Sequence, residues 1–269
     1  MVKRWILPAI AGAGLVGAAL WYALVYRPAL PVPASTPAPP APPAPAAATV
    51  PAEVILHPVP PNAADAAVRP PLPTLNDSDP ALLAALEQIL GVPVVKDFFV
   101  RENLVRRIVV SIDNLARPKL SAERRPIAGP PGLFQVQGDE LHATLDPQNY
   151  ARYRPLVAVV HGLDMQRIAD LYFRFYPLFQ SAYQDLGYPT GYFNDRLIAV
   201  IDVLLATPQP MGPLELVRPR VMYEFADAGL EALPSGQKIL LRMGPDNAVA
   251  VKDKLAELRA ILTAAPTKH

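Results

Sequence analysis

The chain has 269 residues, with 25 lysines and arginines against 24 aspartates and glutamates, and no cysteine. Balanced charge argues against a nucleic-acid binder. The lack of cysteine excludes disulfides, cysteine-ligated zinc and thiol nucleophiles. The 34 prolines exceed what a globular chain of this length carries, so the composition predicts a long proline-rich segment beside an apolar core.

Residues 1–27 predict a transmembrane signal anchor. Lys3 and Arg4 precede an uncharged run of 22 residues, Trp5 to Tyr26, which Arg27 ends. As a helix this run spans about 33 Å, enough for a hydrocarbon core of roughly 30 Å. A cleaved signal peptide typically has an apolar region of about 7–15 residues that ends in small side chains. The longer run here, which ends in bulky aromatic residues, favours an uncleaved anchor over cleavage.

The charges around the apolar run predict its orientation. Lys3, Arg4 and the amino terminus outweigh Arg27, so the positive-inside bias favours a cytoplasmic N-terminus. The rest of the chain is then expected in the periplasm, attached to the inner membrane by a single pass. Gly14 and Ala18 have the small-residue spacing that permits close helix packing, which leaves a homodimer open.

Residues 28–73 predict a disordered linker rich in proline and alanine. Proline fixes φ and lacks an amide donor, so this stretch favours a semi-rigid polyproline II spacer. It reaches about 140 Å when fully extended. We favour a stalk or tether, and a docking tract for aromatic-lined grooves is the alternative. The short apolar run Val54-Ile55-Leu56 is too brief to decide between them.

Residues 74–269 predict one nearly neutral domain, with 21 basic and 22 acidic side chains. The fold expected is mainly α in the α+β class, with a small β-hairpin or three-stranded sheet. The strands are expected at 133–136, 141–144 and 221–225. Capping residues and helical periodicity predict helices at about 79–90, 96–115, 146–161, 164–186, 192–206, 235–243 and 245–262.

Several motifs from Leu72 onward together suggest a family. They include Tyr176-Pro177-Leu178-Phe179-Gln180-Ser181-Ala182-Tyr183, Leu186-Gly187-Tyr188-Pro189, Tyr192-Phe193-Asn194-Asp195-Arg196-Leu197, Ile201-Asp202, Tyr223-Glu224-Phe225-Ala226-Asp227 and Gly236-Gln237-Lys238. On these residues the chain resembles the Domain of Unknown Function 3014 family of bacterial membrane-anchored proteins. The resemblance implies a proteobacterial cell-envelope protein and supplies no activity. Ala116 follows Asn114-Leu115 here, where the family usually has proline, which would alter only a helix end.

The helix expected at 192–206 carries the main candidate chemistry. Asp195 and Asp202 are seven residues apart and share one stripe, and their neighbours are apolar nearly all round. Asp202 is therefore expected to be partly buried. It would act either as a general acid with a raised pKa or, as we favour, in an ion pair. The candidate partners are Arg106, Arg107, Arg174 and Arg196.

Two other polar motifs have local explanations. Asn194 is expected to cap its own helix, and Asp113-Asn114 to form a turn at the end of a helix. Alternatively, both motifs line a shared groove.

An aromatic series, including Tyr172, Tyr176, Phe179 and Tyr183, fits either a ligand groove or, as we favour, a core-facing helix stripe. A groove would draw on Tyr183, Tyr188, Tyr192, Asn194, Asp195, Arg196 and Asp202.

Other recognised chemistry is not evident. The four histidines have no metal-ligand spacing, and we find no nucleophile elbow, phosphate loop or dinucleotide fingerprint. We therefore expect no metal and no cofactor, and no catalytic residue is assigned. The favoured function is binding of a protein or an envelope polymer. The alternatives are a cell-wall hydrolase or lyase that uses Asp195, Asp202 or Glu102 as its acid, and a purely structural tether in a membrane complex.

Overall fold

The computed structural model describes residues 54–60, 71–119, 122–139 and 142–264. These residues belong to one unit, Val50–His269. The predicted anchor at 1–27 and the predicted linker up to residue 53 lie outside the described residues. Within the described ranges, no helix has both the length and the apolar character needed to cross a bilayer.

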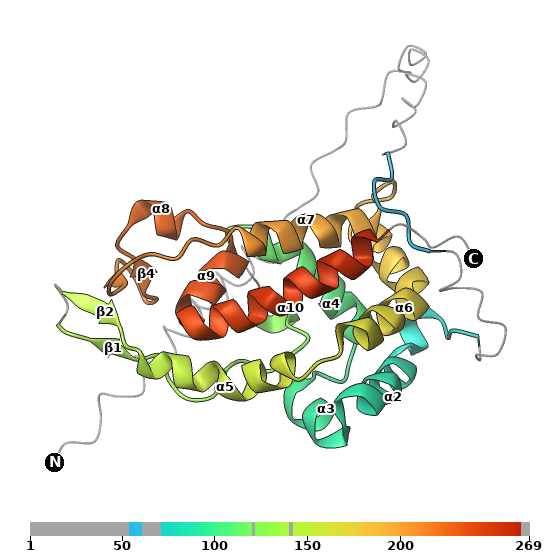
Figure 1. Cartoon of the computed structure of the whole chain (residues 1–269), viewed down its shortest axis with the longest axis horizontal. Helices are drawn as coiled ribbons and strands as arrows, with labels where there is room; N and C mark the ends of the chain where they lie inside the picture. The colour runs from blue at the N-terminus through green and yellow to red at the C-terminus, as the bar shows by residue number, and fades with distance from the viewer. Residues whose placement is uncertain (1–53, 61–70, 120–121, 140–141, 265–269) are drawn as a thin grey trace, which may run out of the picture. The chain divides into compact units, whose positions relative to one another are not determined.

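Helices make up most of the described chain (Figure 1), which confirms the mainly helical fold. Two short 3-10 turns, η2 (Leu75–Asp77) and η3 (Ala122–Arg124), accompany them. The α-helices are α2 (Asp79–Leu90), α3 (Val92–Phe98), α4 (Leu104–Leu115), α5 (Gln148–His161), α6 (Met165–Asp185), α7 (Phe193–Leu205), α8 (Ala228–Glu231), α9 (Ser235–Met243) and α10 (Pro245–Thr263).

The helix predicted at 96–115 is instead two helices, α3 and α4. Phe99 forms an antiparallel bridge with Ile127, which draws the chain out of helical geometry. Asn103 has a left-handed φ of 54°, a conformation that asparagine tolerates. The Asp79 carboxylate, at the start of α2, then accepts the amides of Asn103 and Leu104 at 2.6 and 2.8 Å. A distant side chain therefore caps α4 at the break.

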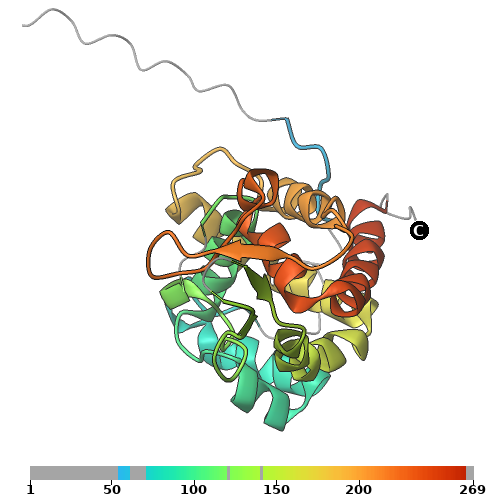
Figure 2. The same cartoon turned by 90° about the vertical axis from the view of Figure 1, so that its left-hand side faces the viewer.

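The sheet has four short antiparallel strands in the order β1-β2-β3-β4, one more than predicted. They are β1 (Val136–Gln137), β2 (Ala143–Leu145), β3 (Glu215–Val217) and β4 (Glu224–Phe225). β3 was not predicted, because a strand of three residues, between Pro213 and Pro219, is too short to show an alternating pattern. It pairs with β2 (Ala143 opposite Leu216) and with β4 (Leu216 opposite Phe225). Figure 2 shows the strands facing the viewer, with helices behind them.

The largest apolar cluster lies among α2, α4, α6 and α7 and includes the fully buried rings Phe175 and Phe193. A second cluster joins the sheet to α9 through Leu216, Phe225 and Leu241. α6 and α7 thus both contribute side chains to the main core, and Phe193, at the corner between them, is fully buried there.

We predict that Gly236→Ala destabilises the domain. A Cβ on Gly236, in α9, would collide with Leu204 Cδ2 and lie 3.0 Å from the carbonyl oxygen of Leu115. Overpacking of this kind costs typically about 1–3 kcal/mol of unfolding free energy, measured by urea denaturation. Gly162→Ala is the matched control, because its nearest neighbour would be 3.6 Å away. Equal stability of the two variants would contradict this packing.

Candidate functional site

The corner between α6 and α7 is fixed by Gln180 of α6. Its Oε1 accepts the Phe193 amide and the Tyr176 hydroxyl, each at 2.9 Å, and its Nε2 donates to the Gly191 carbonyl at 2.7 Å. Phe193 is the first residue of α7, where a helix leaves amides without internal partners. A neighbouring helix thus caps α7 and sets the direction of its first turn.

Aromatic rings pack beneath this corner, and the predicted series lies mainly in the core. Tyr172 stacks on Phe179 with ring centroids 5.6 Å apart, and Tyr183 stacks on Tyr188 at 4.5 Å. Burial, aided by the nearby Tyr192 and Asp195, raises the pKa of Tyr172 well above its usual value. The Tyr172 hydroxyl therefore keeps its proton and donates to Asn194 Oδ1 at 3.1 Å.

The first turn of α7 holds residues 54–60 of the same chain through backbone contacts. Asp195 accepts the amides of Leu56 and His57 at 2.9 and 2.8 Å. Asn194, whose side chain is fully buried, donates from Nδ2 to the His57 carbonyl at 2.8 Å. The Tyr192 hydroxyl accepts the Val59 amide at 2.8 Å. We call Tyr192, Asn194 and Asp195 together the clasp.

One side-chain contact adds to the backbone contacts of the clasp. His57 Nδ1 lies 3.1 Å from Asp195 Oδ1. Asp195 also lies in the first turn of α7, where the positive end of the helix dipole favours a carboxylate. Asn194 was expected to cap its own helix; instead it reaches the segment. The clasp is thus chemically suited to hold a polypeptide, and its carboxylate is already engaged by donors.

Arg196 and Tyr188 belong to a separate network centred on Asp113, at the end of α4. The buried Asp113 carboxylate accepts Arg196 Nε and Arg117 Nη2, each at 2.9 Å. Arg196 Nη2 also donates to the Asp113 carbonyl at 2.8 Å, and the Tyr188 hydroxyl contacts Arg117. Asp113 and Asn114 lie in the last turn of α4, at the helix end as expected, and the Asp113 side chain in addition ties α4 to α7.

The burial predicted for Asp202 is also wrong. Its side chain is 47% exposed, and it pairs with Arg259 of α10, with Arg259 Nη2 3.2 Å from Asp202 Oδ2. None of the four arginines predicted as partners supplies this pair. Although the residues around Asp202 are mainly apolar, one side of α7 faces solvent, and Ala199 and Asp202 lie on it. Asp202 therefore stands apart from the clasp.

The structure brings together three of the seven predicted groove residues, Tyr192, Asn194 and Asp195, around the segment 54–60. Sequence reasoning missed His57 as the partner of Asn194 and Asp195, and Asp113 as the partner of Arg196. A signal for His57 was present, because Val54-Ile55-Leu56-His57 interrupts the proline and alanine repeats.

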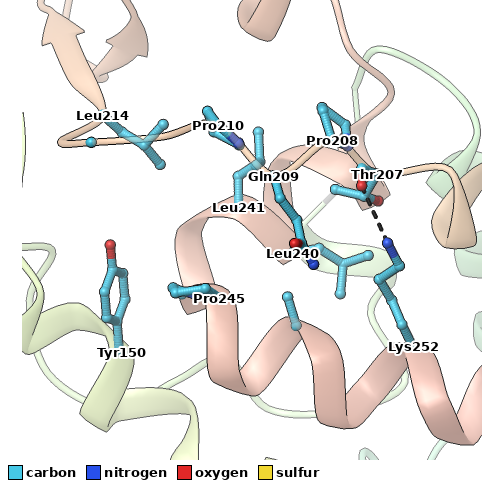
Figure 3. Close-up of a pocket in the computed structure, with 13 residues that line it drawn as sticks. Tyr150, Thr207, Pro208, Gln209, Pro210, Leu214, Leu240, Leu241, Pro245 and Lys252 are labelled. Carbon is cyan, nitrogen blue, oxygen red and sulfur yellow. Dashed lines mark hydrogen bonds between the residues drawn. The ribbon is translucent and has the colours of Figure 1, made fainter.

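A second candidate is a cavity of about 250 Å³ beside α9 and α10 (Figure 3). Its walls are mainly apolar, and Lys252 Nζ is engaged by the Thr207 carbonyl at 3.2 Å. Burial, followed by the charge of Asp146, raises the pKa of the lining residue Tyr150. Across the described ranges, no three histidine, aspartate or glutamate side chains converge to hold a metal ion. The lining residues are Tyr150, Thr207, Pro208, Gln209, Pro210, Gly212, Leu214, Leu240, Leu241, Gly244, Pro245, Ala248 and Lys252.

Fold and site together define a mainly helical α+β domain that holds a segment of its own chain at a helix corner. The model of the family described as Protein of unknown function (DUF3014) matches residues 104–259, and the chain belongs to this family. The match covers the clasp but not residues 54–60. Comparisons with curated proteins and with solved structures gave no significant match.

We predict that Asp195→Asn releases the segment. A nitroxide on Ile55→Cys reports its mobility, because the chain has no other cysteine and Ile55 is exposed. Charge-assisted hydrogen bonds are worth about 1.5–3 kcal/mol, so the ratio of held to released label should fall at least tenfold. Asp202→Asn makes the same change further along α7 and should leave the electron paramagnetic resonance spectrum unaltered. An unchanged spectrum in Asp195→Asn would refute the contact.

We also predict that Asp113 contributes more stability than Asp202. Asp113→Asn weakens the bonds from two arginines to a buried carboxylate, at a cost of about 1.5–3 kcal/mol of unfolding free energy. Asp202→Asn removes an exposed ion pair, worth about 0–1 kcal/mol. Urea denaturation measures both, and a larger loss for Asp202→Asn would reverse the assignment.

Proposed function

We propose that the protein is a single-pass inner-membrane protein, with a cytoplasmic N-terminus, whose domain at 74–269 is a periplasmic binding module. Residues 1–27 would be its anchor, and residues 28–73 would carry the domain away from the bilayer. The apolar run from Trp5 to Tyr26 supports the anchor. Of the two partner classes expected, a protein or an envelope polymer, we propose a protein.

The observation that carries this proposal is the chemistry of the clasp. Four of the hydrogen bonds made by Asp195, Asn194 and Tyr192 go to peptide groups of residues 56–59. Backbone groups are common to every polypeptide, and peptide-recognition sites use them for affinity while pockets read the side chains. Such an array suits a polypeptide segment better than a sugar polymer.

The acids considered for a hydrolase or lyase are poorly disposed for that chemistry. Asp195 accepts two amides, and Asp202 is held at the surface by Arg259. Glu102 is exposed in the turn before α4. A general acid needs a retained proton and a substrate within reach, and none of these settings supports one. We therefore place binding ahead of catalysis.

A structural tether is the second candidate, and one observation favours it. The segment 54–60 lies within the predicted linker, and its bonds to α7 fix the linker to the domain. A tether joined in this way would hold the domain at a set position along its stalk. The tether and the binding module differ in whether the clasp accepts a segment that is not covalently attached.

Peptide binding to an opened variant tests the proposal. In this full-length variant, kept in lipid nanodiscs, glycine and serine replace Val54–Pro60. We expect a fluorescent peptide of residues 54–60 to bind saturably, as measured by anisotropy. Adding Asp195→Asn should weaken binding at least tenfold, because it removes charge-assisted bonds, while Asp202→Asn should not. No saturable binding at millimolar peptide would contradict the binding module.

A further inference from the structure

The segment in the clasp is held by its backbone while its leading side chains face solvent. The side chains of Val54, Ile55 and Leu56 are 77%, 51% and 69% exposed. Apolar burial of these three side chains therefore contributes little to the contact. The contact depends on the hydrogen bonds and on Val59, which is partly buried against the main core. A contact of this kind is specific in geometry but modest in strength.

The hydrogen bonds also define a proline register. The amide donors come from residues 56, 57 and 59, whereas positions 58 and 60 are prolines, which have no amide hydrogen. Within residues 56–60, prolines thus occupy the two positions where the clasp accepts no amide. They also restrict the backbone, which lowers the entropy lost on binding.

Asp195 contacts His57, the residue before the first proline, through both its backbone and its side chain. Its Oδ1 accepts the His57 amide at 2.8 Å and lies 3.1 Å from the imidazole Nδ1. The side chains of the pair are 32% and 19% exposed, so the contact is partly shielded from solvent. A carboxylate at this place complements a basic side chain at position 57.

We propose that residues 54–60 are an exchangeable plug, and that another protein displaces them with a segment that carries a basic residue immediately before a proline. This inference rests on the binding function proposed above. A tethered segment has an effective concentration in the millimolar range, so even weak bonds keep the plug in place. A competing protein displaces the plug by making additional contacts beyond those of the seven plug residues. A second copy of the chain is a poorer competitor. It offers the same segment without the tether and makes no contacts beyond the plug residues.

The test uses the full-length chain in nanodiscs, with a nitroxide on Ile55→Cys. Three synthetic peptides are titrated: the sequence of residues 54–60, the same sequence with histidine and the first proline exchanged, and the sequence with alanine for histidine. The native peptide has no contacts beyond the plug residues, so it should release the label only at millimolar concentration, near the effective concentration of the tethered plug. The exchanged peptide has proline at the position of His57 and therefore lacks that amide. It should need at least a tenfold higher concentration to release the label. The peptide with alanine for histidine lacks the side-chain contact to Asp195 and should need a several-fold higher concentration.

The outcomes separate this inference from the proposed function. A control peptide as potent as the native one overturns the inference, because the clasp would not read the proline register or the basic residue. No release by any peptide, with binding retained by the opened variant, also overturns it but leaves the binding module standing. Failure of the opened variant to bind removes both. Release that rises with protein concentration alone would identify a second copy as the occupant and overturn the assignment to another protein.

Discussion

The side-chain amide of Asn194 is the constraint on which the site depends. It is fully buried, so both of its polar atoms need partners. The Tyr172 hydroxyl, from the helical core, satisfies Oδ1, and the carbonyl of His57 satisfies Nδ2. One partner is therefore inside the domain and the other is in a segment far away in the sequence. The segment 54–60 is therefore packed as part of the folded domain.

Sequence patterns predicted most of the helices, because their signals are local. Asp164 caps α6 as such residues do, and Gly91 and Gly244 end α2 and α9 with positive φ. The division between α3 and α4 could not be predicted from local patterns, because it depends on a hydrogen bond to Asp79, which belongs to another helix. Strand β3 was missed for a related reason, since a three-residue strand is defined only by its neighbours.

The candidate site was predicted in part. Asn194 and Asp195 were named from a short motif, but their role depends on His57, in a stretch assigned to the linker. The sequence predicts partial burial of Asp202, because its neighbours in the helix are apolar nearly all round. The side that faces solvent became clear only once Arg259 of α10 was placed beside it.

Residue-level hydrogen exchange of the full-length chain, measured by nuclear magnetic resonance, tests the central claim most directly. If the clasp holds the backbone, the amides of Leu56, His57 and Val59 exchange at least tenfold more slowly than free peptide amides. Asp195→Asn, which releases the segment, lowers the protection of all three. Free-peptide exchange rates for all three amides in the unmodified chain would contradict the account.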